Sequence, residues 1–446
     1  MTRDTLRSLG LAALLGVAAG CHDMQHDPPP EPDAAVRPDA RVVRACPEAL
    51  LSCASTLDGV DRTQPSTREP FELAWSARFR SAAGLAVLGA HQQLAVRSDE
   101  RAIHLLDVRT GATQLSIDAG EPLALSISAD ADDNIYVAGR TLHAFSATGF
   151  ERWSVALDTE AGLAAAPTIG DGLVYVLTPT TLRALSTTHG GQRWSRAIDS
   201  DVGRSAGRGD TLVVPTAGDG YLALDAATGA ERWRSRQCPH RRYSADPIAT
   251  RTGFVMMESD KLGSTDPPTI RFTMDSCGGK LATLPRTQSS LVLEAPDGQL
   301  LTSPSSGDGL DVGSFGLFNV ATGKPTRGLA VGSGDYRTRI DSRELLAIGA
   351  DGYAYFLHDE QPSPSTSGEP RLFVRRFSLR TGQLVGTVEL ADAFFSHATG
   401  VTMDGSGVLY IARQTSVVAV RTPSPGPAAG RWSLPEGNMR GSRWLN

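Results

Sequence analysis

The chain has 446 residues and a formal net charge of −6, and it is rich in glycine (46) and proline (27). The length allows two or three ordinary domains or one large repeat architecture. The charge provides no basic surface for a nucleic acid, so we expect no nucleic-acid partner, and the glycine and proline content is typical of short strands and tight turns.

Residues 1–20 have the pattern of a secretory signal. Two arginines precede an apolar run, 9–19, that is too short to span a membrane comfortably. The ending VAAGC resembles a bacterial lipobox, with Ala18 where leucine is usual, and this implies that Cys21 becomes lipidated. A plain signal peptide with an unrelated cysteine is the alternative. Because His22 and not an aspartate follows the cysteine, the lipobox implies sorting to the outer membrane.

Residues 21–69 are predicted to be a linker. Their first part, 22–41, is rich in proline, aspartate and alanine and has almost no large apolar side chain, so it cannot bury a core and should form an extended, semi-rigid spacer. The motif CHDMQHD at its start is not expected to bind a metal, because a lipidated Cys21 offers no thiolate.

From about residue 80 the chain repeats two short phrases with a variable period. The first is a turn followed by an apolar strand, as in DDNIYVAG (132–139), GDGLVYVLT (170–178) and ADGYAYFL (350–357). Glycine and asparagine tolerate a positive φ, so Asp-Gly or Asp-Asn before alternating β-branched and aromatic residues predicts a hairpin.

The second phrase ends one strand at a turn and begins the next strand with tryptophan, as in LALDAATGAERW (222–233). Four copies are clear and four have drifted, which makes eight copies between residues 105 and 434. Each unit carries about four short strands, and no helical period follows the signal sequence. Repeats of this kind predict an all-β fold, an eight-bladed β-propeller of four-stranded antiparallel blades.

The full motif, Ala-x-Asp-x-x-Thr-Gly-x-x-x-Trp, stands at Ala223 to Trp233 and resembles the repeat of the PQQ-like (quinoprotein-type) β-propellers. The resemblance covers roughly residues 70–434 and implies a propeller there, followed by a tail at 435–446. In lipobox, size and repeat the chain is also similar to the eight-bladed propeller lipoprotein of the β-barrel assembly machinery, which works by protein–protein contact.

We expect the repeated residues to be structural. The aspartate can accept backbone N–H groups across the turn, the glycine takes the positive-φ position, and the tryptophan can fill the wedge between adjacent blades while its N–H finds a partner. In copies without the tryptophan, Gln114–Ser116, Leu281–Thr283 and Val385 replace it. The structural repeat residues are Asp107, Gly111, Gly149, Trp153, Gly191, Trp194, Asp225, Thr228, Gly229, Trp233, Gly323, Gly382 and Trp432.

Two segments compete to close the ring. FELAWSARF (71–79) looks like an outer strand without a blade of its own, because Trp75 is placed as the repeat tryptophan is. RWSL (431–434) is the alternative. We favour the Trp75 segment, which would join the two ends of the chain in the last blade.

Four cysteines remain after Cys21, an even number for an oxidising compartment. Cys46 and Cys53 are close in sequence and are expected to form a small disulfide loop. Cys238 and Cys277 are the second expected pair, although they start at opposite ends of the sheets and a disulfide needs Cα atoms within about 7 Å. The long connector after Cys238 could bring them together.

No catalytic constellation emerges from the sequence. The founding members of the PQQ-like superfamily are quinone-dependent dehydrogenases with an adjacent Cys-Cys pair, which this chain lacks, so we expect no such cofactor. The nine histidines show no zinc spacing, and SADADDN (128–134) occupies a hairpin-turn position, so no metal is expected.

The resulting hypothesis is a monomeric, lipid-anchored, non-catalytic scaffold in the bacterial cell envelope, at the outer membrane, that binds protein partners. The binding surface would be the loops of one propeller face, with 255–270 and 360–370 the longest candidates. A propeller that binds or hydrolyses a small molecule or glycan in its central channel is the alternative.

Overall fold

The computed structural model describes residues 70–98, 100–124, 126–157, 167–199, 204–216, 220–234, 246–258, 269–273, 282–284, 287–304, 315–319, 322, 324–329, 343–360, 371–390, 397–428, 434 and 444–445. All of them belong to one compact unit, Ser66–Asn446. Outside the described residues lie the signal sequence, the linker and several residues singled out above: Cys21, Cys46, Cys53, Cys238, Cys277, Gly323 and Trp432.

The described residues form eight sheets, and each is built on four antiparallel strands. Blade 1 consists of β2 (Ala82–Leu88), β3 (Gln93–Ser98), β4 (Ala102–Asp107) and β5 (Thr113–Asp118). Blade 2 consists of β6 (Ser128–Ala129), β7 (Ile135–Ala138), β8 (Thr141–Phe145) and β9 (Glu151–Ala156). Blade 3 consists of β10 (Thr168–Gly170), β11 (Leu173–Leu177), β12 (Thr181–Ser186) and β13 (Gln192–Ala197). Blade 4 consists of β14 (Ala206–Arg208), β15 (Thr211–Thr216), β16 (Gly220–Asp225) and β17 (Glu231–Arg234).

The later blades repeat this order. Blade 5 consists of β18 (Ile248–Thr250), β19 (Gly253–Glu258), β20 (Thr269–Thr273) and β21 (Ala282–Leu284). Blade 6 consists of β22 (Thr287–Glu294), β23 (Leu300–Pro304), β24 (Phe315–Phe318) and β25 (Pro325–Leu329). Blade 7 consists of β26 (Arg343–Ile348), β27 (Tyr353–Glu360), β28 (Arg371–Ser378) and β29 (Leu384–Leu390).

Blade 8 is built from both ends of the propeller sequence. Its first three strands are β30 (Ala398–Met403), β31 (Val408–Arg413) and β32 (Ser416–Arg421), and its fourth is β1 (Glu72–Arg78). β1 pairs antiparallel with β32, and Trp75 lies opposite Ala419. The prediction that the Trp75 segment closes the ring is therefore confirmed.

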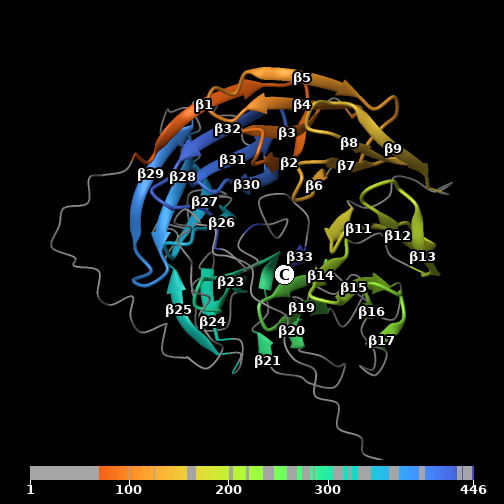
Figure 1. The fold of residues 1–446 in the computed structure, drawn as a ribbon. Helices are drawn as coiled ribbons and strands as arrows, with labels where there is room; N and C mark the ends of the chain where they lie inside the picture. The colour runs from red at the N-terminus through yellow and green to blue at the C-terminus, as the bar shows by residue number, and fades with distance from the viewer. Residues whose placement is uncertain are drawn as a thin grey trace, which may run out of the picture. The chain divides into compact units, whose positions relative to one another are not determined.

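The first strand of each blade lies at the centre, and the blades follow one another around a ring (Figure 1). β2 packs against β6 and β30, β10 packs against β6 and β14, and β26 packs against β22 and β30. An inner strand such as β2 is buried along its whole length, whereas the outermost strand β9 alternates between exposed and half-buried positions. This gradient explains why inner strands read as apolar runs and outer strands as alternating sequences.

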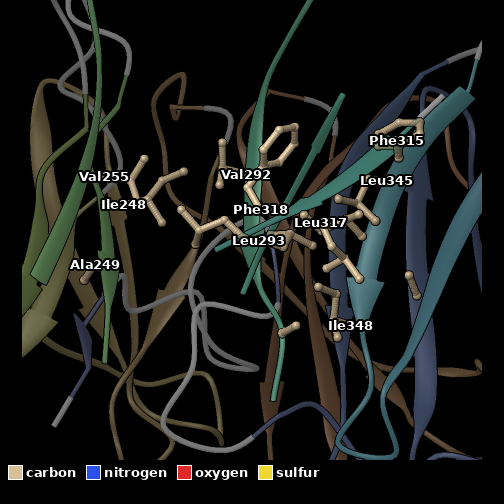
Figure 2. Packing of buried hydrophobic residues seen from close by; sticks show 14 of the residues in the cluster. Ile248, Ala249, Val255, Val292, Leu293, Phe315, Leu317, Phe318, Leu345 and Ile348 are labelled. Atoms are coloured by element: carbon tan, nitrogen blue, oxygen red, sulfur yellow. The ribbon is translucent and has the colours of Figure 1, made fainter. Parts of the chain in front are cut away.

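The hydrophobic core lies between the blades. Most clusters of buried residues join two neighbouring blades, and one of them brings Tyr136 of blade 2 together with Val174 and Val176 of blade 3. The largest cluster extends from blade 4 to blade 7, and Figure 2 shows Ile248 of blade 5 close to Val292 of blade 6. Because no blade buries its faces alone, the ring has to be stabilised as a whole.

The predicted fold is confirmed: the chain is all-β, with eight four-stranded blades and no helix among the described residues. One addition concerns the segment predicted to be a tail. Two of its residues form a short strand, β33 (Trp444–Leu445), which pairs with β14 and makes blade 4 five-stranded.

Candidate interaction face

The repeat turn between the third and fourth strands is held by its own side chains. In blade 4, Asp225 Oδ1 accepts hydrogen bonds from the backbone N–H of Thr228 at 3.0 Å and from its hydroxyl at 2.7 Å. Arg232 donates to the other carboxylate oxygen at 2.7 Å, and together with Thr228 it lowers the pKa of Asp225 to about 2. Asp107 of blade 1 accepts the same bonds from Thr110. The aspartate is thus the predicted turn acceptor.

The glycine of the turn serves two purposes. Gly111, Gly149, Gly229 and Gly382 all have positive φ, between 71° and 85°. A Cβ on Gly229 would also lie 2.7 Å from the indole of Trp194, which belongs to the preceding blade. The turn glycine therefore sets the backbone of its own blade and leaves room for the tryptophan of its neighbour.

One predicted turn position is corrected by a single residue. In blade 3 the positive φ of 70° belongs to Gly190, whose Cβ would meet Trp153, and not to Gly191. The backbone N–H of Gly190 donates to Ser186, as Gly229 donates to Asp225 in blade 4. Gly190 stands four residues after Ser186 and four before Trp194, as Gly229 stands between Asp225 and Trp233, so the spacing of the repeat identifies the glycine that bends and His189 takes the place of Thr228.

The indoles connect each blade to the next. Trp75 Nε1 donates to the carbonyl of Val108 at 2.8 Å, Trp153 Nε1 to Thr187 at 3.0 Å and Trp194 Nε1 to Ala226 at 3.0 Å. Each accepting carbonyl stands one residue after the turn aspartate or serine of the following blade. The predicted inter-blade role of the tryptophan is confirmed at these three junctions, and Trp233 packs half-buried against the cluster that begins in blade 4.

Tyrosines on the second strands share this junction, and the sequence analysis did not single them out. The hydroxyl of Tyr175 donates to Ala226 O at 3.2 Å, the same carbonyl that Trp194 uses, and the two rings lie 6.0 Å apart. The Tyr136 hydroxyl lies 3.3 Å from Thr187 O, the acceptor of Trp153, and donates to Asp130 Oδ2 at 2.7 Å. Their spacing could have indicated them: each tyrosine stands three residues after a turn residue with positive φ, as Tyr410 stands after Gly407.

Where the tryptophan is absent, other side chains take its position. In blade 1 Leu115 occupies the register position of the tryptophan and lies against Gly149 of blade 2. Leu115 is within Gln114–Ser116, the residues predicted to replace the tryptophan. In blade 6 Arg327 occupies this register position, and its guanidinium donates to Leu379 O at 3.1 Å. Leu379 O is the carbonyl of blade 7 that corresponds to Ala226 O in blade 4. The side chains of Leu281–Thr283 are not among those described.

The predicted replacement by Val385 in blade 7 is wrong. Val385 is 49 % exposed, and the register position belongs to Gly386. Phe71, which precedes β1, fills the space beside Gly386 with its ring 6.1 Å from Tyr355. A residue outside every repeat thus replaces a repeat tryptophan, and no local pattern could have indicated it.

These contacts lie on one face of the propeller, which we call the turn face. At this end of each sheet the first strand connects to the second and the third strand connects to the fourth. The opposite end, the loop face, carries the connections from second to third strands and from blade to blade. Hydroxyl groups link the inner strands there: Ser128 donates to Pro167 O at 2.8 Å, and Thr399 donates to Ala82 O at 2.6 Å. Glu344 accepts the N–H of Ala398 at 2.9 Å, and burial raises its pKa.

The loop face has connections of very unequal length. β7 and β8 are joined by only two residues, 139–140, whereas β27 and β28 are joined by 361–370 and β19 and β20 by 259–268. The predicted loops at 255–270 and 360–370 are therefore slightly too long, since residues 255–258, 269–270 and 360 belong to strands. Both pairs of strand ends lie on the loop face, so the two candidate segments start and end on the same side of the propeller.

The described residues contain no group of three or more His, Cys, Asp or Glu side chains that could hold a metal ion. Among the same residues no helix is long and apolar enough to cross a membrane.

Eight sheets in a closed ring, three of whose junctions are made by a repeat tryptophan, define an eight-bladed β-propeller. The family described as outer membrane protein assembly factor BamB matches residues 98–261 and 138–296. The repeat resemblance is thereby confirmed.

Solved structures agree on the fold. BamB from Moraxella catarrhalis is 17 % identical, with a TM-score of 0.56 over 80 % of this chain and 98 % of that one. The computationally designed Ika8 protein is 13 % identical, with a TM-score of 0.56 over 78 % and 99 % of the two chains. No curated protein sequence matches the chain significantly. At these identities the structural likeness shows the propeller fold alone.

Proposed function

We propose that this chain is a non-catalytic, lipid-anchored scaffold of the bacterial cell envelope that binds protein partners in outer-membrane protein assembly. The match of its repeats to the family described as outer membrane protein assembly factor BamB carries the proposal. In this proposal Cys21 bears the lipid, the protein is attached to the outer membrane as a monomer, and residues 22–69 act as its spacer.

The repeat residues support a scaffold and not an active site. Asp225, Gly229 and Trp194 are engaged with one another across the junction of blades 3 and 4. Because the repeat residues of these junctions pack against one another on the turn face, we assign partner binding to the loop face. Long connections on a rigid scaffold are where binding residues concentrate in proteins. We therefore place the partner site around 259–268 and 361–370.

Capture from detergent-solubilised envelopes tests this function. The full-length protein should retain outer-membrane assembly proteins, identified by mass spectrometry, and deletion of 259–268 or 361–370 should reduce their recovery by about tenfold if each loop provides about 1.4 kcal/mol of binding free energy. The matched control is Phe150→Ser, because Phe150 is 76 % exposed in the β8–β9 turn on the opposite face. That variant should capture as the wild type does.

The remaining outcomes are decisive. Loss of capture in Phe150→Ser, with both deletions unaffected, would move the site to the turn face. Absence of any protein partner, together with a bound small molecule or glycan in the purified protein, would overturn the scaffold function. In the same cells Cys21→Ser should move the protein to the soluble fraction, and continued membrane attachment would contradict the lipid anchor.

A further inference from the structure

The inner strands of the propeller differ in length around the ring. In four consecutive blades, 2 to 5, the inner strand is short: β6 has two residues, and β10, β14 and β18 have three each. On the other side of the ring β2 has seven residues and β26 and β30 have six each. The short inner strands therefore lie together, in blades 2 to 5.

The C-terminal strand lies on this side. β33 pairs parallel with β14, with Gly207 opposite Trp444 and Arg208 opposite Leu445, and it also packs against β10 and β18. Figure 1 shows β33 and the C-terminus beside β14, within the ring of blades. Among the described inner strands β14 is the one whose channel-facing edge is paired with a further strand.

The edge of β14 is suited to accept a strand. Ala206 and Gly207 are buried and have little or no side chain, so another backbone can approach closely. Arg208 is held in place by a hydrogen bond from its Nε to Arg251 O of blade 5 at 3.1 Å. An unpaired strand edge presents free N–H and C=O groups, and adding a strand satisfies them.

The chain can supply this strand from its own end. Leu434 is fully buried in the cluster formed by blades 7 and 8. The segment 435–443 joins it to β33, and nine residues can span about 30 Å. Blade 4 stands four places from blade 8, so Leu434 and β33 lie in different parts of the ring.

We propose that the channel-facing edge of β14 is a strand-binding site, which the chain's own C-terminal strand β33 occupies. An extended peptide from a partner could then add to this edge only after β33 has left it. The site lies in the channel and does not depend on the loop-face function proposed above.

A peptide in trans tests this site. The propeller truncated after Leu434 should bind a fluorescently labelled peptide of residues 435–446, and the full-length protein should bind it at least about tenfold more weakly, because its own tail competes. The control peptide carries Trp444→Pro and Leu445→Pro, which remove two backbone donors and should abolish binding. Equal binding by both proteins, or none by a truncated protein that unfolds cooperatively, would overturn the proposal.

Amide hydrogen exchange of the full-length protein tests the same site if the truncated protein does not fold. Full-length Leu445→Pro should show faster exchange at the amides of Ala206–Arg208 than the wild type, while β2 amides on the other side of the channel stay equally protected. Unchanged protection of Ala206–Arg208 in this variant would show that β33 does not cover the edge.

Discussion

Replacement of Trp75 by alanine is expected to destabilise the propeller by about 3–5 kcal/mol, the cost typical of removing a buried tryptophan. Trp75 is 8 % exposed, its ring lies 5.9 Å from that of Tyr410, and its Nε1 donates to Val108 O. It joins the closing strand β1 both to blade 8 and to blade 1. Urea unfolding followed by circular dichroism measures the change in the free energy of unfolding.

Trp75→Phe separates the two parts of this effect. The phenylalanine ring keeps most of the packing but leaves the buried carbonyl of Val108 without its donor, which should cost about 1–3 kcal/mol. A loss below about 1 kcal/mol in Trp75→Ala would mean that ring closure through β1 contributes little to stability.

Gly229→Ala should be destabilising for two separable reasons, and a double-mutant cycle with Trp194→Ala distinguishes them. The φ of 72° is unfavourable for alanine, and the new Cβ would lie 2.7 Å from the indole of Trp194. We expect about 2–5 kcal/mol in total from backbone strain and overpacking. In the Trp194→Ala background the collision disappears, so the coupling energy should be about 1–3 kcal/mol.

Gly172→Ala is the matched control for the backbone part. Its φ is 74°, but a Cβ there meets no atom within 4 Å. It should therefore cost about 1–2 kcal/mol and show no coupling to Trp194. A purely additive cycle for Gly229 and Trp194 would contradict the inter-blade contact.

The sequence predicted the architecture because the propeller is made of local repeats. Asp225, Thr228 and Gly229 interact within one turn, so their spacing records their contacts directly. The tryptophan was predicted to lie between blades, but its acceptor could not be read from sequence because Ala226 O belongs to the backbone of the next repeat.

Exceptions to the repeat were not predictable in the same way. Arg327 replaces an indole by a guanidinium of different shape, and only the register of β24 and β25 shows that the two are equivalent. Phe71 fills the place of a missing tryptophan from outside the repeats. The pairing of Trp444 with Gly207 joins segments without any shared pattern. Each of these contacts depends on which segments the closed ring brings together.

The closing strand also determines the order in which the protein can be completed. β1 is synthesised before every other strand of the propeller, whereas its partner β32 is the last strand of blade 8 to be synthesised. Glu72 of β1 and Arg421 of β32 form an ion pair although they are 349 residues apart in the chain. Bringing ends so distant together costs on the order of 5 kcal/mol in loop-closure entropy. Until then β1 has an unpaired edge, which invites pairing with other chains. The propeller should therefore fold slowly, with formation of blade 8 as a late step that requires both ends of the chain.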